Sequence, residues 1–347
     1  NGQRRAPRTA AHGYAPPAPV VPLAVLAYES RRMRVVSLLP AATEIVAALG
    51  GLDWLVGVSH ECDHPAGVAA KPRITHCAIH GNTAASDTID GWVSDTLATS
   101  GTLYTLDEPL LRALRPDVLI TQRLCDVCAV GYESVRAFAA TLPGPPRVVS
   151  LAPSTLADVL QDVRTVGAAL GVPERAADVV AALEARIAAV CARTATVTRP
   201  RCVLLEWIAP PFRSGHWGPE LVALAGGLEP LGRAGEDAAR VAWDAVVAAA
   251  PDVLVLACCG YDVDRTLADV GLLRARPGWQ DLPAVRAGAV WAVDGSAYFS
   301  RPGPRLADSL EILAEILHPD IFRGRFRARA VRRERLARHQ DGRQRRA

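Results

Sequence analysis

The chain has 347 residues, of which 50% are hydrophobic and 22% are charged; this excludes a largely disordered protein and leaves room for about two domains. No uninterrupted apolar run approaches the ~20 residues of a membrane-spanning helix. The net charge of +3 is uneven, because residues 1–32 carry +4, residues 321–347 carry +9 and the remainder carries −10. An acidic body argues against a nucleic-acid-binding core, so we expect no nucleic-acid partner.

The two ends of the chain are rich in Arg and show no periodic pattern. We expect residues 1–33 to be a disordered extension and residues 321–347 to be an Arg-rich disordered tail. Residues 1–27 have a basic start and an apolar stretch like those of a signal peptide, but Pro22 interrupts the stretch. Met33 directly precedes the first strand-like run, and we expect it to be the natural start. These features favour a cytoplasmic location, with the cell envelope or periplasm as the alternative if the first residues act as a signal peptide.

From residue 34 onward, short apolar runs alternate with helical stretches, which is typical of a parallel α/β architecture. The Gly- and Thr-rich segment 65–103 shows no clear pattern, and within it THCAIH (75–80) favours a loop over a helix. The pattern predicts an N-terminal α/β lobe over residues 34–153. Its expected strands are 34–40, 54–59, 117–121 and 147–151, and its expected helices are 41–51, 108–116 and 134–142.

Residues 154–195 contain no strand pattern and predict a helical linker, in which Ser154 suits an N-cap and Pro173 suits the first turn of a second helix. The alternation then resumes and predicts a C-terminal α/β lobe over residues 196–320. Its expected strands are 201–207, 252–257 and 289–294, and its expected helices are 219–227, 244–251 and 304–319.

Two similar segments, ALRPDVLIT (113–121) and AAAPDVLVLA (248–257), indicate that the lobes are homologous. We therefore expect an α/β fold of two parallel-sheet sandwich lobes joined by a long helical linker. Loops at the carboxyl ends of parallel strands face the space between such lobes, so a ligand is expected there. The aromatic residues of these loops are Trp207, Phe212, Trp217, Tyr261, Tyr298 and Phe299.

Cysteine and histidine side chains in two of the loops have the chemistry of a metal site. Cys125 and Cys128 form a CxxC pair, and with Cys62 and His60 they would make a tetrahedral site for zinc or iron. A lone CxxC pair is a weak signal, because structural zinc sites usually combine two pairs, or one pair with two His. Buried, inert thiols are the alternative.

Catalytic motifs are missing from the sequence, which contains no GxSxG, no P-loop, no HExxH and no GxGxxG after a strand. We therefore expect a binding protein and not an enzyme.

Four segments carry a resemblance to a known family: RVVSLLPAATEIVAALG (34–50), VGVSHECDHP (56–65), LRPDVLITQRLCDVCAV (114–130) and PPFRSGHW (210–217). They resemble the class III solute-binding proteins that serve ABC importers of vitamin B12, siderophores and haem. The resemblance covers about residues 34–319, and HECDHP and CDVCAV are most similar to the vitamin B12 (cobalamin)-binding branch. It implies a rigid, two-lobed clamp, which we expect to be a monomer.

The resemblance further implies that cobalamin or a related corrinoid is captured between the lobes, for ABC-type uptake or for intracellular handling. Phe212 stands where the family places a ring against cobalamin, and a His or Cys side chain would suit the cobalt as a ligand. The expected ligand-binding residues are His60, Glu61, Asp63, Gln122, Trp207, Phe212, His216, Trp217, Tyr261, Asp294, Tyr298, Phe299 and Arg301.

Members of this family dock onto the permease through one acidic residue in each lobe, at the start of the helix before the Pro-Asp strand. Asp244 occupies that position in the second lobe. The matching position in the first lobe is Pro109, with Glu108 one residue out of register. This departure leaves an intracellular role open beside permease docking.

Two other functions stay open. One is a Cys/His metal or metal-cluster protein with a redox role, which would use Cys62, Cys125 and Cys128. The other is a ferric siderophore binding protein. The acidic body disfavours a strongly anionic siderophore, although Arg123, Arg213 and Arg301 would be able to neutralise one locally.

Overall fold

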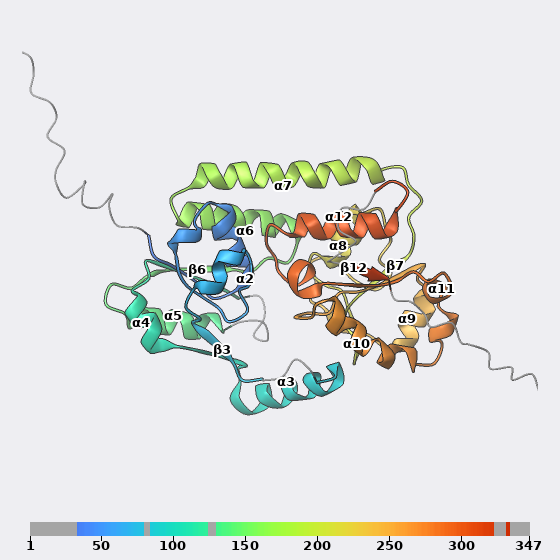
Figure 1. The fold of residues 1–347 in the computed structure, drawn as a ribbon, viewed down its shortest axis with the longest axis horizontal. Helices are drawn as coiled ribbons and strands as arrows, with labels where there is room; N and C mark the ends of the chain where they lie inside the picture. Colours follow the sequence, from blue (N-terminus) through green and yellow to red (C-terminus); the bar gives the residue numbers. More distant parts are fainter. Residues whose placement is uncertain (1–32, 80–83, 124–129, 323–330, 334–347) are drawn as a thin grey trace, which may run out of the picture. The chain divides into compact units, whose positions relative to one another are not determined.

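The N-terminal lobe is built on a parallel sheet (Figure 1). The structure is a computed structural model and describes residues 33–79, 84–123, 130–322 and 331–333 of the chain. The sheet has the strand order β2-β1-β5-β6, so the first strand of the lobe lies inside the sheet. The elements are β1 (Val35–Ser37), β2 (Leu55–Val58), β5 (Val118–Gln122), β6 (Arg147–Leu151), α2 (Pro40–Ala48), α4 (Glu108–Leu114), α5 (Tyr132–Ala140) and the short helices η1 (Leu52–Trp54) and η2 (Ala66–Ala70). Every strand and helix predicted for this lobe is present.

The segment without a clear pattern contains structure that the sequence did not predict. It forms β3 (Thr75–Cys77) and α3 (Ser86–Ser100), and β3 pairs in antiparallel fashion with β4 (Tyr104–Leu106), which follows the segment. The loop interpretation of residues 75–80 is therefore wrong for the first three residues, which form a strand. Only Ser86 is buried within α3, so this helix lacks the apolar stripe by which helices are recognised in a sequence.

The linker consists of α6 (Leu156–Ala169) and α7 (Pro173–Thr194), and Pro173 starts the second helix as predicted. The predicted N-cap is wrong by one residue, because Thr155 and not Ser154 caps α6. The Thr155 hydroxyl accepts a hydrogen bond from the Asp158 backbone N–H at 3.2 Å, and the Asp158 carboxylate accepts one from the Thr155 N–H at 2.9 Å. Both helices pack into hydrophobic clusters of both lobes, so the linker is a stiff part of each core.

The C-terminal lobe has a mixed sheet with the order β12-β11-β10-β7-β8-β9. Its parallel centre, which the sequence predicted, is β7 (Cys202–Trp207), β10 (Val253–Leu256) and β11 (Val290–Val293). The antiparallel additions are β8 (Phe212–Arg213), β9 (Ala239–Arg240) and β12 (Val331–Arg333). The helices are α8 (Gly218–Leu224), α9 (Trp243–Ala249), α10 (Val263–Arg274), η3 (Trp279–Asp281), α11 (Pro283–Arg286), the π-helical turn η4 (Gly295–Phe299) and α12 (Leu306–Leu317).

The tail departs from the expectation of disorder at residues 331–333, which form β12. This strand pairs with β11, the last parallel strand of the C-terminal sheet. An edge strand presents unpaired backbone groups, and these accept any segment that is able to lie alongside. The sequence of the tail, with its many Arg residues, gives no sign of this pairing.

In the N-terminal lobe, hydrogen bonds from Arg34 form a corner at the first copy of the predicted repeat. The Arg34 backbone N–H donates to the Asp117 carboxylate at 2.9 Å, and the Arg34 guanidinium Nε donates to the Leu114 carbonyl at 2.7 Å. Arg115 ends α4 in the left-handed conformation, with φ 42°. The corner thus joins the start of β1 to the end of α4 and the start of β5.

The C-terminal lobe contains the same corner, formed by equivalent groups. The Arg201 N–H donates to the Asp252 carboxylate at 2.8 Å, and Arg201 Nε donates to the Ala249 carbonyl at 2.8 Å. Ala250 ends α9 with the same φ of 42°. Because side chain, backbone and helix end correspond, the structure supports homology of the two sheet-and-helix lobes.

Candidate functional site

A hollow of ≈240 Å³ lies between the two lobes, at the carboxyl ends of their parallel strands. Asp63 contributes from the loop after β2 of the N-terminal lobe, and the other lining residues come from the segments that follow β10 and β11, including the start of α10 and the turn η4. They are Gly260, Asp262, Arg265, Asp294, Ser296 and Ala297. Of these, only Asp63 and Asp294 were among the predicted ligand-binding residues. Asp262, Arg265 and Ser296 were missed, although two of them stand in loops that the strand pattern had already singled out.

Two of the carboxylates in the hollow are held by backbone groups. Asp262 caps α10 by accepting a hydrogen bond from the Arg265 N–H at 2.7 Å, and Asp294 caps the turn η4 by accepting one from the Ala297 N–H at 2.7 Å. Burial raises the pKa of Asp294 above its ordinary value. Capping fixes both carboxylates in place at the wall of the hollow.

A buried set of ion pairs joins the lobes beside the hollow. Arg301 donates to both carboxylate oxygens of Asp63 and lies 3.5 Å from Glu44 of α2. Arg305 donates two hydrogen bonds, of 2.9 and 2.5 Å, to the carboxylate of the same Glu44. Glu44 and Arg301 are 4% and 6% exposed, whereas the Asp63 side chain is 64% exposed, so the network is buried at Glu44 and open to solvent at Asp63. The sequence offers one signal for it, a single carboxylate within the apolar helix AATEIVAALG.

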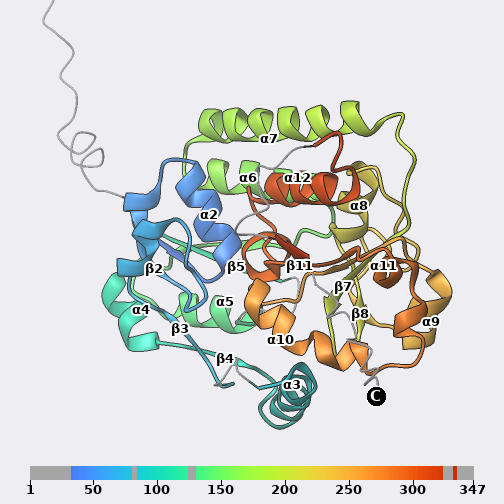
Figure 2. The same ribbon diagram turned by 45° about the vertical axis from the view of Figure 1, so that its right-hand side comes forward.

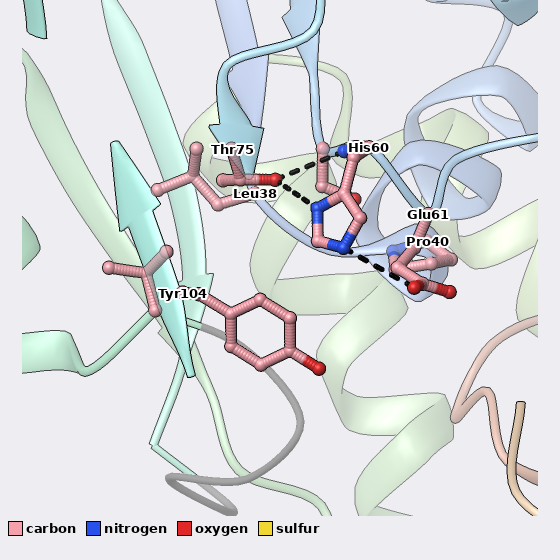
Figure 3. Close-up of a pocket in the computed structure, with 8 residues that line it drawn as sticks. Leu38, Pro40, His60, Glu61, Thr75 and Tyr104 are labelled. Atoms are coloured by element: carbon pink, nitrogen blue, oxygen red, sulfur yellow. Dashed lines mark hydrogen bonds and ion pairs between the residues drawn. The ribbon is translucent and has the colours of Figure 1, made fainter. Parts of the chain in front are cut away.

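His60 and Glu61 lie in the N-terminal lobe and line a second, much smaller hollow (Figure 3). Its volume of ≈10 Å³ is about that of one water molecule, so it is no corrin site. His60 Nδ1 is 2.7 Å from the Thr75 hydroxyl, and Nε2 is 3.3 Å from the Glu61 carboxylate. A hydrogen bond with Cys77 and the pairing with Glu61 raise the pKa of His60 to about 9.

These observations bear on the predicted metal site. A His with a pKa of about 9 is protonated at neutral pH, and a metal ion requires the neutral imidazole. The Cys62 thiol is 1% exposed, lies 3.1 Å from both the Thr43 and Ser59 hydroxyls, and belongs to the hydrophobic core. Cys125 and Cys128 lie outside the described residues. Within the described ranges, no three His, Cys, Asp or Glu side chains are arranged to hold a metal ion.

Three of the predicted aromatic ligand contacts are core residues. Trp217 and Phe299 pack in one hydrophobic cluster of the C-terminal lobe, and the Trp217 indole donates to the Phe299 carbonyl at 2.9 Å. Tyr261 belongs to the other cluster, with its ring centroid 4.9 Å from that of Trp207. All three rings are therefore buried, at 4–6% exposure.

The remaining predicted ligand-binding residues are partly buried, except Gln122, which is buried. Phe212 and Tyr298 each have an arginine guanidinium beside the ring, at 5.8 and 5.4 Å from the ring centroid. His216 stacks on Trp217 at 5.5 Å, and burial lowers its pKa. Gln122, at the end of β5, is 7% exposed.

Glu206, at the end of β7, is a half-buried carboxyl group that the sequence did not flag. Burial raises its pKa to about 8, while one oxygen accepts a hydrogen bond from the Gly215 N–H at 2.9 Å. Between pH 4.5 and about 8, Glu206 therefore keeps its proton in the folded protein and loses it in the unfolded chain. Stability must fall as the pH rises through this range.

We expect Glu206→Gln to remove this loss, because the amide stays neutral at every pH. Relative to the wild type, the variant should gain on the order of 2 kcal/mol between pH 5 and pH 8. Urea unfolding of both proteins at the two pH values measures the difference. An equal slope for the wild type and the variant would show that Glu206 ionises normally in the folded protein.

The predicted docking residues lie in the first turns of corresponding helices, one position out of register with each other. Glu108 stands in the first turn of α4 and Asp244 in the first turn of α9, the helices that end in the two repeated corners. Both side chains are exposed. In the described part of the chain, no helix combines the length and apolar character needed to cross a membrane.

Comparison with known proteins gives the family. The model of the family described as "Periplasmic binding protein" matches residues 35–297. No curated protein sequence matches the chain. Among solved structures, the apo form of the periplasmic heme-binding protein RhuT from Roseiflexus sp. RS-1 is similar, with 25% identity and a TM-score of 0.63 over 83% of this chain and 99% of that one.

Two further structures share the fold. A periplasmic heme-binding protein from Pseudomonas aeruginosa has 22% identity and a TM-score of 0.63, over 83% of this chain and 94% of its own. The periplasmic vitamin B12 binding protein BtuF of Vibrio cholerae has 21% identity and a TM-score of 0.58, over 82% and 96%. With two homologous α/β lobes, a helical linker and a family match over most of its length, the chain belongs to the periplasmic binding protein family.

Proposed function

We propose that the protein binds cobalamin or a related corrinoid between its lobes, as the substrate-binding component of an ABC-type uptake system. The observation that carries this proposal is the charge of the interlobe hollow, which is lined by the carboxylates of Asp262 and Asp294 beside Asp63, whose charge is paired with Arg301. A corrinoid presents carboxamide N–H groups around its ring, and carboxylates accept hydrogen bonds from such donors. Haem instead presents two carboxylates, which these acids would repel.

The cations near the hollow are already paired, which further disfavours an anionic ligand. Arg301 holds Asp63 and Glu44, and Arg265 forms an ion pair with Asp269 at 2.9 Å. The two other arginines considered for an anionic siderophore are engaged as well. Arg123 contacts Glu133 at 3.4 Å, and Arg213 contacts Glu236 at 3.2 Å.

The family bears on where the protein works. Its members are periplasmic binding proteins, which implies a periplasmic or envelope location and gives no support to the cytoplasmic location favoured by the sequence. An ABC permease is the partner that fits such a location. We propose that Glu108 and Asp244, exposed on equivalent helices, face this permease.

An absorbance titration with aquocobalamin, cyanocobalamin and haem, followed by desalting, tests the ligand. We expect about one corrinoid per chain to be retained and haem to be lost. Retained haem with no retained corrinoid would refute the proposal. Zinc or iron found by elemental analysis, with no corrinoid, would instead support the metal-protein alternative.

A charge-removing variant sharpens this test. Asp262→Asn keeps an oxygen for the helix cap but removes the negative charge, so cobalamin affinity should fall about tenfold, as for loss of a charged hydrogen bond. Asp281→Asn is the matched control, because Asp281 is an exposed acid that pairs with Arg286 at 2.7 Å outside the hollow. Equal affinities for both variants would remove Asp262 from the ligand site.

A further inference from the structure

Helix α3 belongs to the N-terminal lobe by its connections and contacts the C-terminal lobe with its first turn. It lies between β3 and β4, which pair with each other. Figures 1 and 2 show it on the side of the sheets opposite the linker helix α7, beside α10 of the C-terminal lobe. We call residues 84–100 the strap.

The start of the strap is hydrogen-bonded into the C-terminal lobe. Ser86 is fully buried, and its backbone N–H donates to the Asp269 carboxylate at 2.8 Å. The Ser86 carbonyl accepts a hydrogen bond from the Trp207 indole at 3.2 Å. The Arg265 guanidinium donates to the Ala84 carbonyl. Three side chains of one lobe thus hold the backbone of the other.

Two side chains of the strap add to this docking. Ile89 packs against the hydrophobic cluster of the C-terminal lobe, and Asp90 forms an ion pair with Arg240 at 2.8 Å. Beyond them the helix is exposed or half-buried, and Trp92 is 41% exposed. The strap is therefore held at one end by a few polar contacts and one apolar side chain. Such a segment opens far more readily than the linker helices, which are part of both cores.

The docking surface and the interlobe hollow share a residue. Arg265 pairs with Asp269 at 2.9 Å, donates to the Tyr261 hydroxyl at 3.0 Å and lies 4.2 Å from the centroid of that ring. The same Arg265 lines the hollow. A ligand that contacts this wall therefore meets the side chain that holds the strap.

The hollow is also small. Its volume of ≈240 Å³ is below the ~300–1,000 Å³ that binding pockets for small molecules usually have. A flat macrocycle requires the walls to separate before it enters. The linker is anchored in both cores, whereas the strap contacts the C-terminal lobe only through residues 84–90.

We propose that the strap is a latch between the lobes, and that a ligand enters and leaves the hollow when the strap undocks from the C-terminal lobe. The identity of that ligand rests on the proposed function, whereas the docking equilibrium does not. An undocked α3 is a 15-residue helix without tertiary support, which is marginal in water. Undocking is therefore visible as hydrogen exchange of its amides.

The first test uses the ligand-free, full-length protein. Ile89→Ala should raise the exchange rates of the α3 amides about tenfold, because a packed apolar side chain of the dock is truncated. Trp92→Ala is the matched control, since it removes a larger but exposed ring from the same helix and should leave docking unchanged. Equal exchange in the wild type and Ile89→Ala would overturn the latch.

The second test uses cobalamin-loaded protein and stopped-flow measurement of ligand release. Ile89→Ala should release cobalamin about tenfold faster than the wild type, whereas Trp92→Ala should not. If the wild type retains cobalamin and Ile89→Ala releases it at the same rate, the latch is refuted while the proposed function stands. If the wild type retains none, the proposed function fails and the exchange experiment alone decides the latch.

Discussion

Glu44→Ala is expected to destabilise the protein by about 3–5 kcal/mol, the cost of leaving Arg305 without its carboxylate and Arg301 without one of its two. Glu44 is 4% exposed and contacts two guanidiniums, that of Arg305 at 2.5 and 2.9 Å and that of Arg301 at 3.5 Å. Removing it leaves the Arg305 charge next to an empty space in the interior. Urea unfolding monitored by circular dichroism measures the loss.

The chain offers a matched control for this variant. Glu133 also contacts two arginines, Arg123 at 3.4 Å and Arg136 at 3.0 Å, but its side chain is 67% exposed. Glu133→Ala should therefore cost less than about 1 kcal/mol, as exposed ion pairs do. If both variants lose a similar free energy of unfolding, the burial of Glu44 does not strengthen its ion pairs.

Gly295→Ala is expected to cost about 1–3 kcal/mol or more and to disturb the wall of the interlobe hollow. A Cβ at this position would stand 2.2 Å from the Cys258 carbonyl oxygen and 2.7 Å from the Ala257 carbonyl carbon. Both are backbone atoms at the end of β10, so relief requires the strand ends to move apart. Gly295 lies between Asp294 and Ser296, which line the hollow, so cobalamin binding should weaken as well.

Gly271→Ala is the control for this substitution. Gly271 lies inside α10, and a Cβ there would meet nothing within 4 Å. The alanine should stabilise the protein by about 0.5–1 kcal/mol, because it lowers the entropy of the unfolded chain without a clash. A Gly295→Ala protein as stable as the wild type would show that the two strand ends separate at little cost.

The candidate site separates into parts that a sequence predicts well and parts that it does not. The loops after the parallel strands were identified correctly as the place of the hollow, because strand periodicity and the βα order fix which ends face the ligand. Which individual side chains line the hollow was harder to predict. Tyr261, Trp217 and Phe299 were expected at the ligand and lie in the core, because a ring in a loop packs on whichever surface its backbone brings near.

By itself, the sequence determined the two α/β lobes, the helical linker and the repeated helix–Pro-Asp–strand segments, since these depend on local periodicity. Only the tertiary structure decided which distant groups meet. Glu44 and Arg305 stand 261 positions apart, and Ser86 and Asp269 stand 183 apart, yet both pairs form hydrogen bonds. Neither contact leaves a periodic trace in the sequence, because each depends on how the two lobes are placed against one another.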